Sequence, residues 1–397
     1  MNIQEKLSPQ VKQIPPSGIR KFFDLVVATK GVISLGVGEP DFVTPWHVRE
    51  SSIHSLEQGM TSYTSNSGLL ELREEICRYM DETFALKYSP NNEIMVTVGA
   101  SEAIDIALRT IASQGDEVLI VEPCYVSYGP CATLAGATPV SVPTYQKDDF
   151  KLMPEVLESK ITPKSKAIIM CFPNNPTGGV MEEEDLKKIA DIIKKHDLLV
   201  ISDEVYAELT YGKKHASIAN IEGMKDRTIL ISGLSKSFAM TGWRIGFAMA
   251  HPEIIAAMLK IHQYTILCAP IMGQIAALEA LRNGKCEMDK MIEQYDQRRK
   301  LIVKGFQEIG LSCHIPKGAF YAFPNIEATG YEDHQFAEEL LKETKVAVVP
   351  GSVFGQGGKG FIRCSYATSY SQITEALERI GEFVLPLIDK NKNEQAI

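Results

Sequence analysis

The chain has 397 residues, of which 45% are hydrophobic and 23% are charged, and its formal net charge is −9. This length exceeds that of a typical single domain and the apolar content is sufficient for a buried core, so we expect two lobes. The negative charge argues against nucleic acids and anionic membrane surfaces as partners.

The cysteines and the N-terminus bear on the cellular compartment. The eight cysteines are scattered without a Cys-x-x-Cys pair, which is typical of reduced thiols in the cytoplasm. The N-terminus is polar, and no apolar run approaches the length of a membrane span. The histidines show no metal-ligand spacing. We therefore predict a cytoplasmic protein with no membrane partner and no metal.

The central part of the chain has the pattern of an α/β domain. Short β-branched runs alternate with amphipathic stretches between residues 68 and 270, which indicates βαβ units and a largely parallel sheet. Helices are predicted at Glu71–Tyr79, Glu102–Ile111 and Glu183–Lys195. The predicted strands are Ile94–Val98, Val118–Val121, Ala167–Phe172, Leu198–Ser202, Thr228–Ser232 and Ile245–Met249.

A smaller α/β lobe is expected after a long helical pattern at Met288–Ile309. Its predicted strands are 318–323, 346–349 and 361–364, and its predicted helices are 335–343 and 372–383. The segment 1–44 is rich in Pro and Gly and is expected to pack on this lobe. We therefore predict a large domain at 45–287 and a small domain made of 1–44 and 288–397.

Chemically useful residues follow the predicted strands. In open parallel sheets, ligands bind outside the carboxyl ends of the strands. Segments that are far apart in the sequence should therefore line one crevice. They are Gly99-Ala100-Ser101, Tyr125, Asn174-Asn175, Asp203 with Tyr206, and Lys236.

Lys236 lies in an otherwise apolar stretch of small residues, 231–246. Burial there would lower its pKa, because desolvation disfavours the ammonium form. A neutral amine can attack a carbonyl group and hold it as a Schiff base. A single lysine is more often exposed, but the convergence of the other segments favours the reactive interpretation.

Two positions suit an anionic group. Gly99–Ser101 follows a strand and begins a helix, whose N-terminus can bind a phosphate, although a simple serine cap is an equal alternative. Arg244 can add a bidentate, charge-assisted contact. Together these residues are compatible with a phosphate-bearing ligand.

Four further residues suit an aromatic ring. Asp203 can keep a ring nitrogen protonated or serve as a turn residue. Tyr206 and Asn175 can hydrogen-bond a ring hydroxyl, and Tyr125 can stack on the ring. A phosphate, a pyridine nitrogen, a phenolic oxygen and an aldehyde together describe pyridoxal 5′-phosphate.

In these motifs the chain resembles the class I aminotransferases of the fold-type I pyridoxal-phosphate superfamily, in the branch of prokaryotic aspartate and aromatic aminotransferases. The resemblance covers nearly the whole chain and implies a large domain with a mostly parallel sheet and a smaller α/β domain. The motifs that carry it are Gly38-Glu-Pro-Asp-Phe42, Tyr63 with Gly68-Leu69, Gly99-Ala-Ser-Glu102, Pro173-Asn-Asn-Pro-Thr-Gly178, Ser202-Asp-Glu-Val-Tyr206, Ser235-Lys-Ser-Phe-Ala-Met-Thr-Gly-Trp-Arg244 and Phe361-Ile-Arg363.

The resemblance implies a role for each matching position. Lys236 would bind the cofactor covalently and move the proton at the substrate Cα. Arg363 would clamp the substrate α-carboxylate, and Gly38, Tyr125 and Asn175 would line the substrate site. The cofactor-binding residues would be Tyr63, Gly99, Ala100, Ser101, Tyr125, Asn175, Asp203, Tyr206, Ser235, Lys236 and Arg244.

Two further points follow from the resemblance. Tyr63 would reach the phosphate in the neighbouring subunit, which implies a homodimer. Many relatives carry a hydroxyl residue where this chain has Gly233, so we expect that phosphate contact to be lost or supplied by Ser235.

We predict an aminotransferase that moves the amino group of an L-amino acid to a 2-oxo acid such as 2-oxoglutarate, with ping-pong kinetics. Aspartate-selective relatives can carry a lysine at the position of Ser101, and the segment Ile14–Ile19 suits an apolar substrate. Aromatic or broad specificity is therefore favoured. Alternatives are an aspartate- or N-acetyl-diaminopimelate-selective enzyme, a β-eliminating lyase, and a non-catalytic regulator, which would need an added DNA-binding domain.

Overall fold

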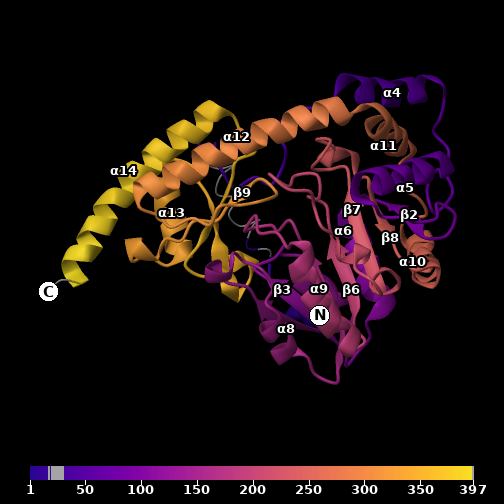
Figure 1. The fold of residues 1–397 in the computed structure, drawn as a ribbon, viewed down its shortest axis with the longest axis horizontal. Coiled ribbons are helices and arrows are strands. Elements are labelled where there is room, and N and C mark those ends of the chain that lie inside the picture. Colours follow the sequence, from indigo (N-terminus) through magenta and orange to yellow (C-terminus); the bar gives the residue numbers. More distant parts are fainter. Residues whose placement is uncertain (17, 19–30, 396–397) are drawn as a thin grey trace.

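Seven strands form the central sheet in the order β2-β8-β7-β6-β5-β3-β4 (Figure 1). The computed structural model describes residues 1–16, 18 and 31–395. Strand β8 is antiparallel to both of its neighbours, and the remaining pairs are parallel. The strands are β2 Ile94–Thr97, β3 Glu117–Glu122, β4 Thr138–Pro143, β5 Ser165–Cys171, β6 Leu199–Asp203, β7 Thr228–Gly233 and β8 Gly246–Met249.

Alternating apolar residues in these strands pack helices on both faces of the sheet. In β5, Ile168 and Met170 face the core under α8 and α9, whereas Ile169 and Cys171 face the core that contains α6. The helices around the sheet are α4 Trp46–Glu57, α5 Leu70–Phe84, α6 Gly99–Ile111, α7 Tyr128–Leu134, α8 Pro154–Lys160, α9 Glu183–Lys195, α10 Pro252–Thr265 and α11 Ile271–Asn283.

Strand β4 was not predicted from the sequence. It is the edge strand beside β3, it is only partly buried, and Pro139 and Pro143 interrupt the β-branched pattern. Proline is tolerated there because an edge strand leaves backbone groups unpaired. The six predicted strands of this sheet are present, with ends displaced by at most two residues.

The C-terminal part begins with the 25-residue helix α12, Lys285–Ile309, which lies along α14, Tyr370–Gln395 (Figure 1). Strands β11 Val349–Pro350, β12 Ile362–Ser365 and β9 Tyr321–Ala322 form an antiparallel sheet in that order. Helix α13 is Asp333–Thr344. The 3₁₀ helices of the chain are 146–148, 218–220, 225–227, 241–243, 327–329, 351–354 and 356–358.

The N-terminal segment contacts both parts of the molecule. Strand β1, Ile33–Ser34, pairs in parallel with β10, Val346–Ala347. The short helix α2, Pro9–Gln13, follows α1, Ile3–Lys6, and lies against α7 beside the central sheet. None of the helices in the described part of the chain is both long and apolar enough to span a membrane.

The sheet topology explains why residues distant in sequence meet. Strands β2, β3, β5, β6 and β7 point their carboxyl ends to the same edge, and the antiparallel strand β8 begins there. The residues after the first five strands and the residues before β8 therefore lie together. The cavity that contains the predicted site residues lies at this edge.

Candidate active site

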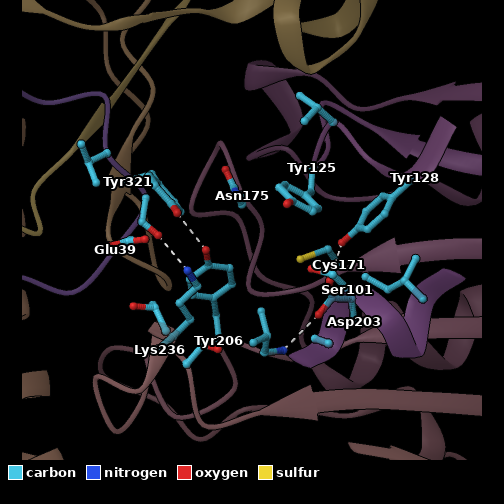
Figure 2. A pocket seen from close by; sticks show the side chains of 18 of the residues that line it. Glu39, Ser101, Tyr125, Tyr128, Cys171, Asn175, Asp203, Tyr206, Lys236 and Tyr321 are labelled. Atoms are coloured by element: carbon cyan, nitrogen blue, oxygen red, sulfur yellow. Dashed lines mark hydrogen bonds between the residues drawn. The ribbon is translucent and has the colours of Figure 1, made fainter. Parts of the chain in front are cut away.

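A cavity of about 430 Å³ lies where these strand ends meet the C-terminal sheet (Figure 2). Eleven predicted residues line it: Gly38, Ala100, Ser101, Tyr125, Asn175, Asp203, Tyr206, Ser235, Lys236, Arg244 and Arg363. Nine further residues that line it were not predicted: Val37, Glu39, Ile104, Val126, Tyr128, Cys171, Val205, Thr241 and Tyr321.

Lys236 follows β7 and projects into this cavity (Figure 2). Its Nζ atom donates a hydrogen bond to the Gly38 carbonyl oxygen at 2.7 Å. Burial lowers the pKa of Lys236 to about 8; the Glu39 carboxylate raises this pKa, and the Arg363 guanidinium lowers it. A large share of the amine is therefore neutral near pH 8, as nucleophilic attack on a carbonyl requires.

Asp203 ends β6 and is 4% exposed. One carboxylate oxygen accepts a hydrogen bond from the Tyr128 hydroxyl at 2.6 Å, and the other accepts one from the Val205 amide at 3.2 Å. Burial raises the pKa of Asp203, whereas these two hydrogen bonds lower it. The carboxylate is thus held in a fixed orientation, in which it can pair with a protonated ring nitrogen.

The N-terminus of α6 forms a compact cradle together with Arg244. Gly99 has φ +75°, a backbone conformation that favours glycine, and the Arg244 guanidinium lies against it. Gly99 itself does not line the cavity, whereas its neighbours Ala100 and Ser101 do. A helix N-terminus beside a guanidinium group suits a phosphate dianion, and the cradle therefore fits the phosphate of the cofactor.

Arg363 reaches the cavity from β12 and is 3% exposed. It donates hydrogen bonds to the Asn175 Oδ1 atom at 3.0 Å and to the Gly36 carbonyl oxygen at 2.6 Å. Its guanidinium carbon lies 4.6 Å from the ring centre of Tyr321. The buried Nε atom has no partner among the described residues. Because the guanidinium of Arg363 also lines the cavity, it can bind a carboxylate ligand there.

Tyr206 and Tyr321 meet across the cavity from different parts of the chain. Their hydroxyl oxygens are 2.8 Å apart. A Cβ at Gly38 would lie 2.7 Å from the Tyr321 hydroxyl oxygen, so a side chain at this position would displace that hydroxyl. The ring of Tyr321 thus contacts the Arg363 guanidinium, and its hydroxyl lies close to the Gly38 backbone.

The absence of a hydroxyl residue at Gly233 has a steric reason in this chain. A Cβ at Gly233 would lie 2.9 Å from the Ile245 carbonyl oxygen and 3.0 Å from the Gly246 Cα atom. Ser235, in contrast, lines the cavity.

Tyr63 does not line the cavity of its own chain and is 81% exposed. Its predicted contact lies in a neighbouring subunit and stays a prediction. Of the segment Ile14–Ile19, residues 17 and 19 lie outside the described part of the chain.

The comparisons with known proteins agree with this geometry. Residues 30–380 match the model of the family "Aminotransferase class I and II". The putative aminotransferase YugH of Bacillus subtilis is 59% identical over 95% of this chain and 98% of its own. Aromatic-amino-acid aminotransferase 2 of Thermococcus litoralis is 45% identical over 94% of this chain and 97% of its own.

Solved structures give the same result. An aromatic aminotransferase from Pyrococcus horikoshii superposes with a TM-score of 0.88 at 46% identity, covering 92% of this chain and 98% of that one. Aspartate aminotransferase from Thermus thermophilus with maleate superposes with a TM-score of 0.91 at 35% identity. The match covers 95% of this chain and 99% of that one. The predicted fold type and cofactor are confirmed: the chain belongs to the class I and II aminotransferases, which depend on pyridoxal phosphate.

Proposed function

We propose that this aminotransferase acts on aromatic or on a broad range of L-amino acids and passes the amino group to a 2-oxo acid such as 2-oxoglutarate, in two alternating half-reactions. The observation that carries this proposal is the charge of the cavity wall. Among the described residues that line it, the cations are Lys236, Arg244 and Arg363.

Each of these three cations has a task that does not involve the substrate side chain. Lys236 holds the cofactor, Arg244 binds the phosphate and Arg363 binds the α-carboxylate. The described wall therefore offers no further cation to a distal carboxylate, and Val37, Ile104 and Val126 add apolar surface. Such a wall favours neutral side chains, because a dicarboxylate would lose hydration without gaining an ion pair.

The cofactor supplies an aldehyde carbon for covalent attachment and a ring that withdraws electrons from the substrate Cα. Neutral Lys236 would hold that carbon covalently and, once freed from it by the substrate amine, would remove the proton from the substrate Cα and deliver it to the former aldehyde carbon of the cofactor. Asp203 keeps the ring nitrogen protonated, and Tyr125 stacks on the ring.

The remaining polar residues hold the ends of the cofactor and the substrate. The amides of Gly99 and Ala100, the hydroxyls of Ser101 and Ser235, and Arg244 bind the phosphate. Asn175 accepts from Arg363 through Oδ1, which leaves its amide N–H groups for the ring oxygen, where Tyr206 also donates. Arg363 fixes the α-carboxylate through its guanidinium group, beside the Gly38 backbone.

We also propose a homodimer in which Tyr63 contacts the phosphate bound by the partner subunit. Large apolar side chains are exposed on α4, on the loop after it, at the start of α5 and at the end of α10, which is unusual for a solvated surface. They are Trp46, Ile53, Leu56, Met60, Tyr63, Leu70, Tyr264 and Ile266.

Two further proposals concern organisation and compartment. The pairing of β1 with β10 supports a small domain made of 1–44 and 288–397 beside a large domain at 45–287.

All eight cysteines are free, and five of them are buried, which supports a reducing compartment such as the cytoplasm.

A substrate panel tests the proposed specificity. The purified enzyme is supplied with 2-oxoglutarate and with phenylalanine, tyrosine, tryptophan or aspartate, and kcat/KM is measured for each donor. We expect the aromatic donors to be used at least as efficiently as aspartate. Turnover of aspartate alone would contradict the proposal.

A further inference from the structure

Two buried tyrosine hydroxyls form an isolated pair in the wall of the cavity (Figure 2). Tyr206 follows β6 of the central sheet, and Tyr321 lies on β9 of the C-terminal sheet. They are 3% and 1% exposed. Within the described part of the chain, each hydroxyl has the other as its hydrogen-bond partner.

The direction of this hydrogen bond follows from counting protons. A phenol carries one proton and can accept hydrogen bonds on its oxygen. If Tyr206 donated its proton to Tyr321, it could not donate to the cofactor ring oxygen. Tyr206 can donate into the cavity only when Tyr321 donates to Tyr206.

Both protons are present near neutral pH. Burial raises the pKa of Tyr206 well above its ordinary value, and burial also raises that of Tyr321. The charged or titratable groups that face the pair are Arg363, Cys171, Tyr125 and Lys236.

We propose that Tyr321 is a positioning residue for catalysis: it donates to the Tyr206 hydroxyl, directs the Tyr206 proton at the cofactor ring oxygen, and strengthens that second hydrogen bond. Hydrogen bonds in a chain polarise one another, so a phenol that accepts one becomes a stronger donor. This inference rests on the proposed placement of the ring oxygen at Tyr206.

The surroundings of Tyr321 restrict it to this role. Its hydroxyl lies against the Gly38 backbone, where no Cβ would fit. Its ring packs on the Arg363 guanidinium at 4.6 Å and on Phe320 at 4.9 Å between ring centres. The hydroxyl therefore cannot turn away without displacing the contact with Arg363. In Tyr321→Phe the ring contacts remain and only the donated proton is lost.

The test is a pH titration of the visible absorption of the lysine-bound cofactor, which reports the proton shared between the ring oxygen and the Lys236 nitrogen. Weaker donation to the ring oxygen leaves more negative charge there, so this proton is held more tightly and the midpoint rises. Tyr206→Phe should raise the midpoint by about one pH unit, or tenfold in proton affinity. Tyr321→Phe should raise it by about 0.4 unit, or two- to threefold.

The double variant decides whether Tyr321 acts through Tyr206. In the Tyr206→Phe background, Tyr321→Phe should cause no further shift. The matched control is Tyr366→Phe, which removes a similarly buried hydroxyl that donates to the Ala319 carbonyl oxygen at 3.1 Å and should leave the midpoint unchanged.

The other outcomes are distinguishable. A shift in Tyr206→Phe with none in Tyr321→Phe would overturn the role of Tyr321 alone. An equal effect of Tyr321→Phe in both backgrounds, or a shift in the Tyr366→Phe control, would also overturn it. No shift in Tyr206→Phe would overturn the proposed position of the ring oxygen, and the inference with it.

Discussion

At the scale of single residues, burial decides the chemistry of the cavity. Lys236 loses hydration inside the cavity, which lowers its pKa to about 8, and Asp203 is held by the hydroxyl of Tyr128. The first effect makes an amine nucleophilic near neutral pH. The second orients a carboxylate that would otherwise rotate.

The protonation of Lys236 can be followed in the cofactor-free protein. Since the neutral amine is the nucleophile, the rate of covalent cofactor attachment should rise with pH and reach half of its maximum near pH 8. The unfolded chain binds more protons than the folded one between this pKa and 10.5, so the contribution of Lys236 to stability rises with pH over that interval. A rate that still increases steeply at pH 10 would contradict the lowered pKa, and Lys236→Ala is the unreactive control.

Asp203 and Tyr128 should show graded effects on turnover. Asp203→Asn removes the charge opposite the ring nitrogen, and we expect kcat to fall at least about a hundredfold while the cofactor stays attached. Tyr128→Phe removes one hydrogen bond to that charge, and about a tenfold loss is expected. The two values of kcat, measured beside the absorption spectrum, check this order; a larger loss in Tyr128→Phe would contradict it.

At the scale of elements, a pair of glycines brings α6 close to the sheet. Gly233 of β7 and Gly246 of β8 are partners in the antiparallel ladder. A Cβ at Gly246 would lie 2.5 Å from the Gly99 carbonyl carbon at the start of α6. The phosphate cradle therefore depends on the absence of a side chain from β8.

Gly246→Ala should damage both stability and cofactor binding. The added methyl group meets backbone atoms, which cannot rotate away, so we expect a loss of about 2–3 kcal/mol in the free energy of unfolding. The control is Gly242→Ala, where an added Cβ meets nothing within 4 Å. Denaturant titration and equilibrium binding of the cofactor measure both effects; equal behaviour of the two variants would refute the account of the cradle.

The sequence predicted those parts of the site that follow strands in recognisable motifs. The predicted strands and motifs led to Lys236, Asp203 and Arg244 because strand ends in a parallel sheet converge. Tyr128 lies three residues after Tyr125, at the start of α7, and this proximity in the sequence was a usable signal. Tyr321 could not be found in this way, because its place depends on how the C-terminal sheet meets the central one.

At the scale of the whole molecule, the cavity draws residues from the central sheet, from the segment after β1 and from β12. The exposed apolar residues on α4, α5 and α10 lie in the part of the molecule that is distant from α14 (Figure 1). A second copy of the chain that covers this surface would bring Tyr63 to the partner's phosphate cradle.

Trp46→Glu should dissociate the proposed dimer. Trp46 is 57% exposed on α4, and a buried, unpaired carboxylate at an interface is costly. Leu385→Glu is the matched control, because Leu385 is 49% exposed on α14. Sedimentation velocity should show monomers for Trp46→Glu and dimers for Leu385→Glu. Trp46→Glu should also bind the cofactor more weakly than the wild type in an equilibrium binding titration. Dimers that persist in Trp46→Glu would place the interface elsewhere.

The most direct measurement is the absorption spectrum of the purified protein before and after one aromatic amino acid is added without any 2-oxo acid. We predict a visible band of the lysine-bound cofactor that is absent from Lys236→Ala. In the wild type this band should be replaced by that of the aminated cofactor, with one equivalent of 2-oxo acid released. A band that persists after the aromatic amino acid is added, with no 2-oxo acid released, would contradict the proposed transamination at Lys236.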